Sequence, residues 1–134
     1  MNINDKSVFE IQGHEIIPGI SSQVAVATDI NSRRVLFKIP MYIDGYNIED
    51  CTISVRCITA AGRFVEFILT NTETRTGDDN TYIYAEWVMS ADVTATEGIV
   101  TYDISICDKT KTQYAWHTLP STFTVMEGMK IPTE

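Results

Sequence analysis

Asn31-Ser-Arg-Arg-Val-Leu-Phe-Lys-Ile-Pro-Met-Tyr-Ile-Asp-Gly45 is the most informative stretch of this chain. Its apolar residues Val35, Phe37 and Ile39 recur at every second position, with Arg34 and Lys38 on the opposite parity. A β-strand points successive side chains to opposite faces, so this alternation predicts a strand with one buried face and one basic face.

The end of the same stretch predicts how that strand stops. Pro40 has no N–H to donate to a ladder, so it should end the strand or lie on a sheet edge. Asp44-Gly45 predicts a turn, because glycine tolerates positive φ and aspartate hydrogen-bonds its own backbone. The segment therefore gives information about the fold and about attachment to a partner, and nothing in it indicates a catalytic reaction.

Short alternating runs recur along the whole chain and are separated by turn residues, a pattern typical of an all-β sandwich or barrel. Met89–Glu97 is the exception, and we expect a helical turn or a crossing loop there. Asn71–Gly77 is polar and is expected to form an exposed hairpin tip. The predicted strands are Val8–Gln12, Gln23–Thr28, Arg33–Ile39, Thr52–Thr59, Phe64–Thr70, Thr81–Val88, Ile99–Cys107, Gln113–His117 and Thr122–Glu127.

The strand parity also predicts which side chains form the core. Trp87 has core parity, whereas Cys107 falls on the face opposite the core. The expected inward-facing residues are Ile53, Val55, Cys57, Val65, Phe67, Leu69, Ile83, Ala85, Trp87, Val100, Tyr102, Ile104, Ile106, Phe123 and Val125.

Length and charge limit the classes of protein. At 134 residues the chain is expected to be one domain, 1–134, with flexible tails at 1–6 and 129–134. Its net charge of -8 disfavours nucleic acid as a partner, because the phosphate backbone repels an acidic chain. There is no secretory leader pattern and no apolar run of about 20 residues, so we expect no membrane insertion.

Searches for reactive chemistry find no local signature. His14 and His117 have no Gly-x-Ser-x-Gly elbow to work with, so no catalytic residue is assigned and the protein is expected not to be an enzyme. Cys51, Cys57 and Cys107 lack the spacing of a zinc site and are expected to be free thiols. No cofactor and no metal are predicted.

Five residues remain as candidate contacts with a partner: Arg33, Arg34, Lys38, Tyr114 and Trp116. The two arginines have guanidinium groups that suit a phosphate or a partner carboxylate, although exposed strand arginines are commoner. Trp116 beside Tyr114 offers an aromatic platform for a sugar or a protein.

Several motifs in order resemble the immunoglobulin-like N-terminal domain of phage baseplate upper proteins. Each motif is weak alone, and their ordered combination from about residue 20 onward is moderately specific. They are Asn31–Pro40 with Asp44-Gly45, Ala60-Ala61-Gly62, Trp87, Ala95-Thr-Glu-Gly98 leading into Val100-Thr101-Tyr102, and Trp116–Val125 with Glu127-Gly128.

The resemblance implies an all-β, immunoglobulin-like antiparallel β-sandwich of about 8–9 strands. It also implies a non-enzymatic virion protein that docks on other tail, baseplate or fibre proteins and is made in the bacterial host cytoplasm. The expected partners are other phage virion proteins and further copies of the chain in a homo-oligomer.

Two alternatives stay open. One is a carbohydrate-binding module that recognises a host surface glycan through Trp116 and Tyr114. The other is a capsid-decorating or head-fibre protein. The chain is either a stand-alone adaptor or a fragment of a longer protein.

Overall fold

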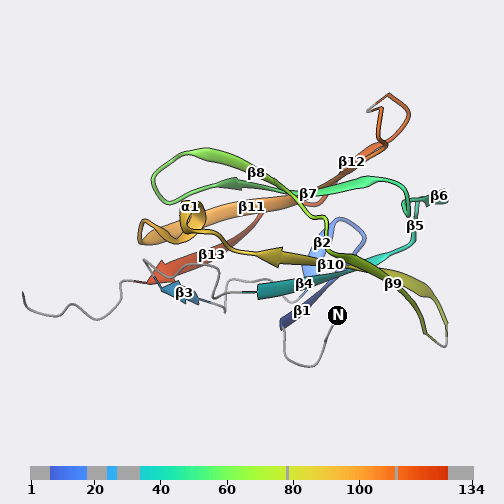
Figure 1. The fold of residues 1–134 in the computed structure, drawn as a ribbon, viewed down its shortest axis with the longest axis horizontal. Helices are drawn as coiled ribbons and strands as arrows, with labels where there is room; N and C mark the ends of the chain where they lie inside the picture. Colours follow the sequence, from blue (N-terminus) through green and yellow to red (C-terminus); the bar gives the residue numbers. More distant parts are fainter. Residues whose placement is uncertain (1–6, 18–23, 27–33, 78, 111, 127–134) are drawn as a thin grey trace, which may run out of the picture.

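The structure is a computed structural model that describes residues 7–17, 24–26, 34–77, 79–110 and 112–126. The expected tails at 1–6 and 129–134 lie outside these residues. Two β-sheets pack face to face as the layers of a sandwich (Figure 1). The all-β sandwich predicted from the strand pattern is confirmed, and the barrel alternative is not, because the sheets are separate.

The five-stranded sheet has strand order β2-β1-β4-β10-β9, and the six-stranded sheet has order β3-β13-β11-β7-β8 with β12 beside β11. The first sheet is formed by β2 (Glu15–Ile17), β1 (Ser7–Gln12), β4 (Arg34–Pro40), β10 (Thr81–Val88) and β9 (Thr72–Thr76). The second sheet is formed by β3 (Val24–Val26), β13 (Ser121–Met126), β11 (Gly98–Cys107), β7 (Thr52–Ile58), β8 (Phe64–Ile68) and β12 (Ala115–His117).

The strand order is that of an immunoglobulin-like sandwich. That fold places strands A, B, E and D in one sheet and G, F and C in the other, with C′ beside C in variable-type domains. Here β1-β4-β10-β9 corresponds to A-B-E-D, and β13-β11-β7-β8 corresponds to G-F-C-C′. Two pairs depart from an antiparallel arrangement, since β1 runs parallel to β4 and β3 runs parallel to β13.

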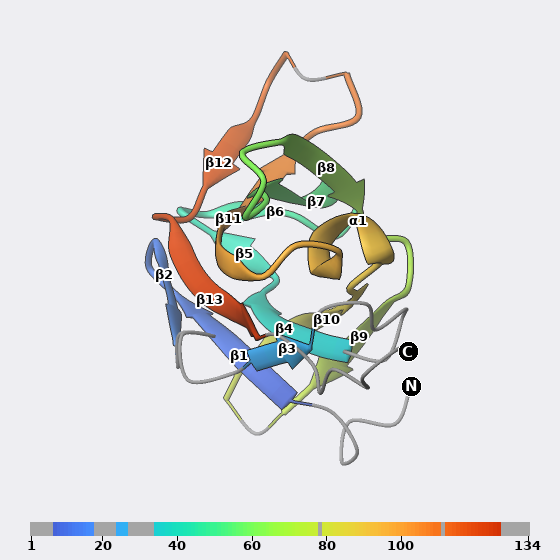
Figure 2. The same cartoon turned by 90° about the vertical axis from the view of Figure 1, so that its left-hand side faces the viewer.

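A short hairpin and a helical turn complete the described elements. The hairpin of β5 (Tyr42–Ile43) and β6 (Tyr46–Asn47) lies at one end of the sandwich. The helical turn α1 (Ala91–Thr94), which was expected in this region, lies at the other end, which faces the viewer in Figure 2.

The segment 31–45 behaves as its sequence predicts from Arg34 onward. Strand β4 runs through the five-stranded sheet and ends at Pro40. Asp44 and Gly45 have φ of 51° and 80°. Positive φ at both central residues is typical of the type I′ turn that suits a two-residue hairpin. Leu36 is also fully buried, although its parity is that of the basic face.

All nine predicted strands have a counterpart, but four observed strands were not predicted. Strands β2, β5 and β6 have two or three residues each, too few to show a period. The fourth is β9, where the prediction of a hairpin tip was wrong. Its sequence Thr-Glu-Thr-Arg-Thr carries no apolar signal, because an edge strand needs only threonine's β-preference and a neighbour to pair with.

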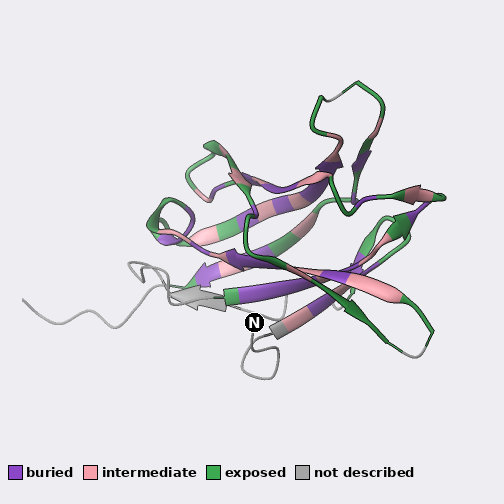
Figure 3. Cartoon of the chain, turned by 45° about the vertical axis from the view of Figure 1, so that its right-hand side comes forward, coloured by how far each residue is buried: buried purple, intermediate pink, exposed green. Residues whose placement is uncertain are grey.

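The core lies between the sheets, where buried bands alternate with less buried ones along the strands (Figure 3). Trp87 is 1% exposed and its ring lies 5.7–6.4 Å from four other aromatic rings. These rings belong to Phe37, Phe67, Tyr102 and Phe123. The expected core is confirmed, except that Val65 and Phe67 are half-buried because β8 is at the sheet edge.

Just after β12, Thr118 hydrogen-bonds the backbone of Ile104 on β11 through both its side chain and its own backbone. Its Oγ1 accepts a hydrogen bond from the Ile104 N–H at 2.9 Å, and its own N–H donates to the Ile104 carbonyl at 3.0 Å. The residue is buried, so Thr118→Val leaves the Ile104 N–H without its acceptor at nearly unchanged shape. We expect the free energy of unfolding to fall by about 1–3 kcal/mol.

Urea unfolding checks this expectation. Thr101→Val on the outer face of β11 is the matched control and should change stability by less than about 0.5 kcal/mol. Equal effects of the two substitutions would contradict the role given to the Thr118 hydroxyl.

Candidate functional site

The basic residues predicted as contacts lie on β4 and are held by neighbouring side chains. Arg34 Nη1 is 3.2 Å from Oε1 of the buried Glu86. Lys38 Nζ is 4.0 Å from Glu10 Oε2 and lies 4.2 Å above the Tyr82 ring centroid. Arg33 lies outside the described residues. The basic side chains of β4 are therefore paired with glutamates on neighbouring strands, so the outer face of the five-stranded sheet is not uniformly basic.

The aromatic residues predicted as a platform lie beside the other sheet and pack within the protein. Trp116 is 6% exposed and its indole stacks on the His14 ring at 4.8 Å. Tyr114 stacks on Tyr46 at 4.2 Å with the rings 6° from parallel. These contacts attach the β1–β2 turn and the β5–β6 hairpin to the segment around β12.

The histidines take part in the same packing. The Nδ1 atom of His14 is 2.7 Å from the His117 carbonyl, and the Leu119 N–H donates to the His14 carbonyl at 2.7 Å. His14 is exposed in the β1–β2 turn, and His117 lies in β12, within the predicted strand Gln113–His117. The structure thus brings the His14 ring, the Trp116 indole and the His117 carbonyl together, whereas Arg34 and Lys38 contact Glu86, Glu10 and the Tyr82 ring instead.

Asp108 organises the loop that leads to Tyr114. Its carboxylate accepts hydrogen bonds from the Thr110 hydroxyl and from the N–H groups of Gln113 and Tyr114. The Thr110 hydroxyl, followed by the backbone donors, lowers the pKa of Asp108 to about 2. The N–H groups of Gln113 and Tyr114 are bonded to Asp108, and the strand predicted over Gln113–His117 therefore begins only at Ala115.

The loop is therefore expected to be sensitive to acid. Because the pKa is lower in the folded state than the ordinary 3.8, the loop's contribution to stability is complete above about pH 4. It is lost as the pH falls towards 2. NMR titration of the Asp108 carboxyl carbon should give a midpoint near 2, and Asp108→Asn should remove the pH dependence of the Gln113 and Tyr114 amide signals. A carboxyl midpoint near 4 would contradict this role.

The cysteines are free, as predicted. Burial raises the pKa of the Cys57 thiol to about 12, with the nearby Asp103 charge adding to the effect. Cys51 and Cys107 are half-buried. In the part of the chain that the structure describes, no group of three His, Cys, Asp or Glu side chains is placed to hold a metal ion. None of the described helices is long and apolar enough to cross a membrane.

The outer face of the six-stranded sheet is the most apolar exposed surface among the described residues. Five of the eight exposed large hydrophobic side chains belong to it: Ile58, Phe64, Ile68, Ile99 and Met126. We call these five residues the apolar patch. Sequence reasoning assigned Val65, Phe67 and Leu69 inward, and the same parity places Phe64 and Ile68 outward, so the signal for this surface was present in the sequence.

A polar row crosses this face through the apolar patch. Arg56 on β7 donates two hydrogen bonds to Asp103 on β11, at 2.8 and 2.5 Å. Glu66 on β8 is opposite Arg56 in the register and accepts a hydrogen bond from Ser54 Oγ at 3.4 Å. Hollows of about 260 and 300 Å³ flank the row, one beside Ile58 and Phe64 and the other beside Ile68.

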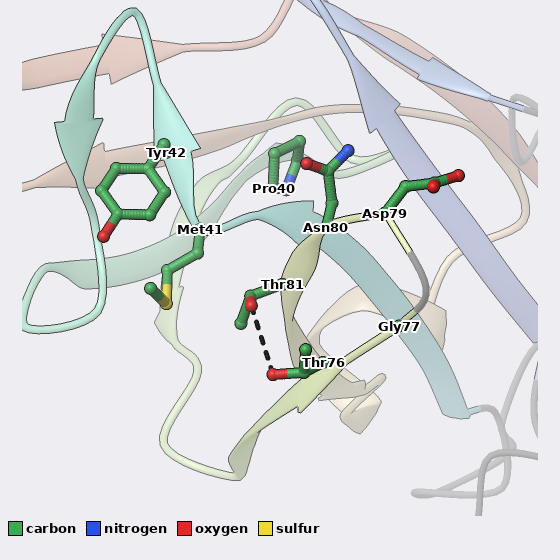
Figure 4. A pocket seen from close by; sticks show the side chains of 8 residues that line it. All are labelled: Pro40, Met41, Tyr42, Thr76, Gly77, Asp79, Asn80 and Thr81. Atoms are coloured by element: carbon green, nitrogen blue, oxygen red, sulfur yellow. Dashed lines mark hydrogen bonds between the residues drawn. The ribbon is translucent and has the colours of Figure 1, made fainter.

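A separate hollow of about 430 Å³ lies where β4 meets β5, next to the β9–β10 hairpin (Figure 4). Tyr42 is 59% exposed at one side of it, and the Asp79 and Asn80 side chains lie at the other. The Thr76 and Thr81 hydroxyls hydrogen-bond each other at 3.2 Å across the base of the hairpin. The hollow therefore combines an exposed aromatic ring with hydrogen-bonding groups.

Comparison with known proteins gives a likeness of fold to a solved structure. No family model matches the sequence, and no curated protein matches it significantly. A copper-bound variant of a Campylobacter jejuni protein matches with a TM-score of only 0.35 and 13% identity over 62% of each chain, and it carries no argument. The N-terminal domain of phage TP901-1 ORF48 matches with a TM-score of 0.51 and 14% identity, over 92% of this chain and 98% of that chain. This chain therefore has a fold similar to that of a phage protein domain.

Proposed function

We propose that this chain is a non-enzymatic structural protein of a phage particle, which docks on other virion proteins of the tail, baseplate or fibre. The observation that carries the proposal is the fold similarity to the N-terminal domain of phage TP901-1 ORF48, which extends over nearly the whole of both chains. A shared fold does not define a function. The ordered motifs in the sequence, which resemble the same class of domain, supply the second line of support.

The surface chemistry is consistent with docking. The apolar patch on the outer face of the six-stranded sheet includes the exposed side chains of Phe64 and Met126, and aromatic residues and methionine are enriched in protein interfaces. The His14 ring stacks on Trp116, and its Nδ1 atom lies 2.7 Å from the His117 carbonyl. In this proposal the protein resides in the virion, as a homo-oligomer bound to other virion proteins.

Immunogold electron microscopy of purified particles tests the proposal. An antibody raised against this chain should label one end of the tail of intact particles. Label on the capsid would favour the capsid-decorating alternative. Finding the protein only in the soluble fraction of infected cells, with no label on particles, would contradict a structural role in the virion.

A glycan-binding function is a second candidate, at a different place from the one first expected. Trp116 and Tyr114 are stacked on other rings, so the support for a sugar platform moves to the hollow beside Tyr42. Sugars bind to exposed aromatic faces flanked by hydrogen-bonding side chains. Glycan-array binding that is lost in Tyr42→Ala and kept in Tyr114→Phe would support this function, whereas no binding by the intact chain would exclude it.

A further inference from the structure

Strand β8 is an open edge of the six-stranded sheet. Among the described strands it pairs only with β7. On this pair the Thr59 N–H donates to the Arg63 carbonyl at 2.9 Å, and the Leu69 N–H donates to the Ile53 carbonyl at 2.8 Å. Hydrogen-bonded and non-hydrogen-bonded pairs alternate in an antiparallel ladder, so the odd-numbered residues of β8 bond to β7.

The even-numbered residues of β8 consequently direct their backbone groups to the open side. These are Phe64, Glu66 and Ile68, and each offers one N–H and one C=O. Their side chains also project onto the outer face, and Phe64 and Ile68 are each 63% exposed. One strand thus presents both unpaired backbone groups and exposed apolar side chains.

This edge lacks the features that usually prevent strand addition, such as lysine, proline or a bulge. Among the other edge strands, β9 carries Glu73 and Arg75, which form an ion pair at 2.6 Å, and β2 and β3 have only three residues each. The contrast indicates that β8 is the edge available to an extended partner segment.

The charge of Glu66 on β8 indicates which extended partner segments can pair with this edge. Glu66 is exposed at the centre of β8, and the nearby Arg56 guanidinium is bonded bidentately to Asp103. A second copy paired antiparallel about Glu66 would place two glutamates opposite each other, which is destabilising. A lysine or arginine opposite Glu66 would instead form a favourable cross-strand pair.

We propose that β8 is a strand-addition site for an extended apolar–basic–apolar segment of another virion protein. The basic side chain lies opposite Glu66, and the flanking apolar side chains contact Phe64 and Ile68. This inference rests on the proposed docking function and assigns to it a surface and a partner chemistry.

Two synthetic peptides test the site on the intact chain. The first, Ser-Val-Thr-Lys-Thr-Ile-Ser, places valine, lysine and isoleucine on one face of a strand, and the second has glutamate in place of lysine. Fluorescence anisotropy should show the lysine peptide binding about tenfold more tightly. Amide NMR signals of Phe64–Ile68 should shift on its addition.

Charge reversal supplies the decisive comparison. Glu66→Lys should reverse the order of the two peptides, whereas the matched control Glu73→Lys on the β9 edge should leave it unchanged. Phe64→Ser with Ile68→Ser should weaken both peptides. Failure of both peptides to bind, or an order that does not respond to Glu66→Lys, would overturn the proposal.

Two further results separate this proposal from its alternatives. A dimer in sedimentation that tightens in Glu66→Gln would assign the edge to a second copy and overturn the heterologous partner. Particle labelling reports on the proposed function independently. Labelled particles combined with no peptide binding would refute the β8 site alone, and unlabelled particles would refute the virion role.

Discussion

Trp87→Ala is expected to lower the free energy of unfolding by about 3–5 kcal/mol. Trp87 lies near the end of β10 and contacts aromatic rings from both sheets: Phe37 on its own sheet, and Phe67, Tyr102 and Phe123 on the facing one. Truncation would remove one of the largest buried side chains and leave a cavity between the layers. The surrounding strands can fill that space only in part, because each is fixed by its ladder.

Trp87→Phe is the informative companion, because Trp87 Nε1 is buried without a hydrogen-bond partner among the described residues. Phenylalanine removes this unsatisfied donor while keeping an aromatic ring, so its cost should be below about 2 kcal/mol. Phe64→Ala, at an exposed position, should change stability by less than about 0.5 kcal/mol. Chemical denaturation of the three variants measures the differences, and equal losses for Trp87→Ala and Phe64→Ala would contradict this description of the core.

Gly98→Val is expected to cost about 2–5 kcal/mol. Gly98 begins β11 with φ of +127°, a backbone conformation that side chains rarely allow. A Cβ there would lie 3.1 Å from the Cβ of Ala60, so strain and crowding add together. The glycine therefore allows the turn after α1 to enter the longest strand of the sandwich.

A matched control separates strain from crowding at this position. Gly62 also has positive φ, at +83°, but a Cβ there would meet no atom within 4 Å, so Gly62→Val should show the strain alone, about 1–3 kcal/mol. Adding Ala60→Gly to Gly98→Val should recover part of the loss. If thermal and denaturant unfolding showed strictly additive effects for Ala60→Gly and Gly98→Val, the contact between the two side chains would be refuted.

These core and turn positions matter for the proposed docking because they hold β8 in place. Phe67 on β8 packs against Trp87, so the same strand has one face in the core and the other in the apolar patch. A rigid inner face keeps the backbone groups of the outer edge aligned. That alignment reduces the conformational entropy lost when a partner strand adds.

Local periodicity was sufficient to predict most strands and the core. Val35, Phe37 and Ile39 occupy alternate positions because every second residue of β4 faces the other sheet. This alternation can be recognised in the sequence of the strand alone, without knowing which strands pair with it. The Asp44-Gly45 turn was predictable for the same reason, since φ preferences belong to single residues. Strand β9 was not, because its polar edge position removes the alternation on which the prediction depends.

The candidate site was only partly predictable from sequence, and its decisive features are long-range. Trp116 is covered by His14 and Tyr114 by Tyr46, contacts between segments far apart in the chain. Likewise, Arg34 became a structural ion pair only through Glu86 on the neighbouring strand. Residues whose roles depend on a distant partner cannot be assigned from their own neighbourhood.

The amino-acid sequence was sufficient to predict an all-β chain, the strands that build its sandwich, and the inward face of each main strand. It did so because side-chain alternation and turn preferences act over a few residues. The tertiary structure was needed to show that β8 pairs only with β7 among the described strands, and that Phe64, Glu66 and Ile68 share its free side. Strand order results from pairing across the whole chain, and the hydrogen bonds left unmade at an edge exist only once that order is set.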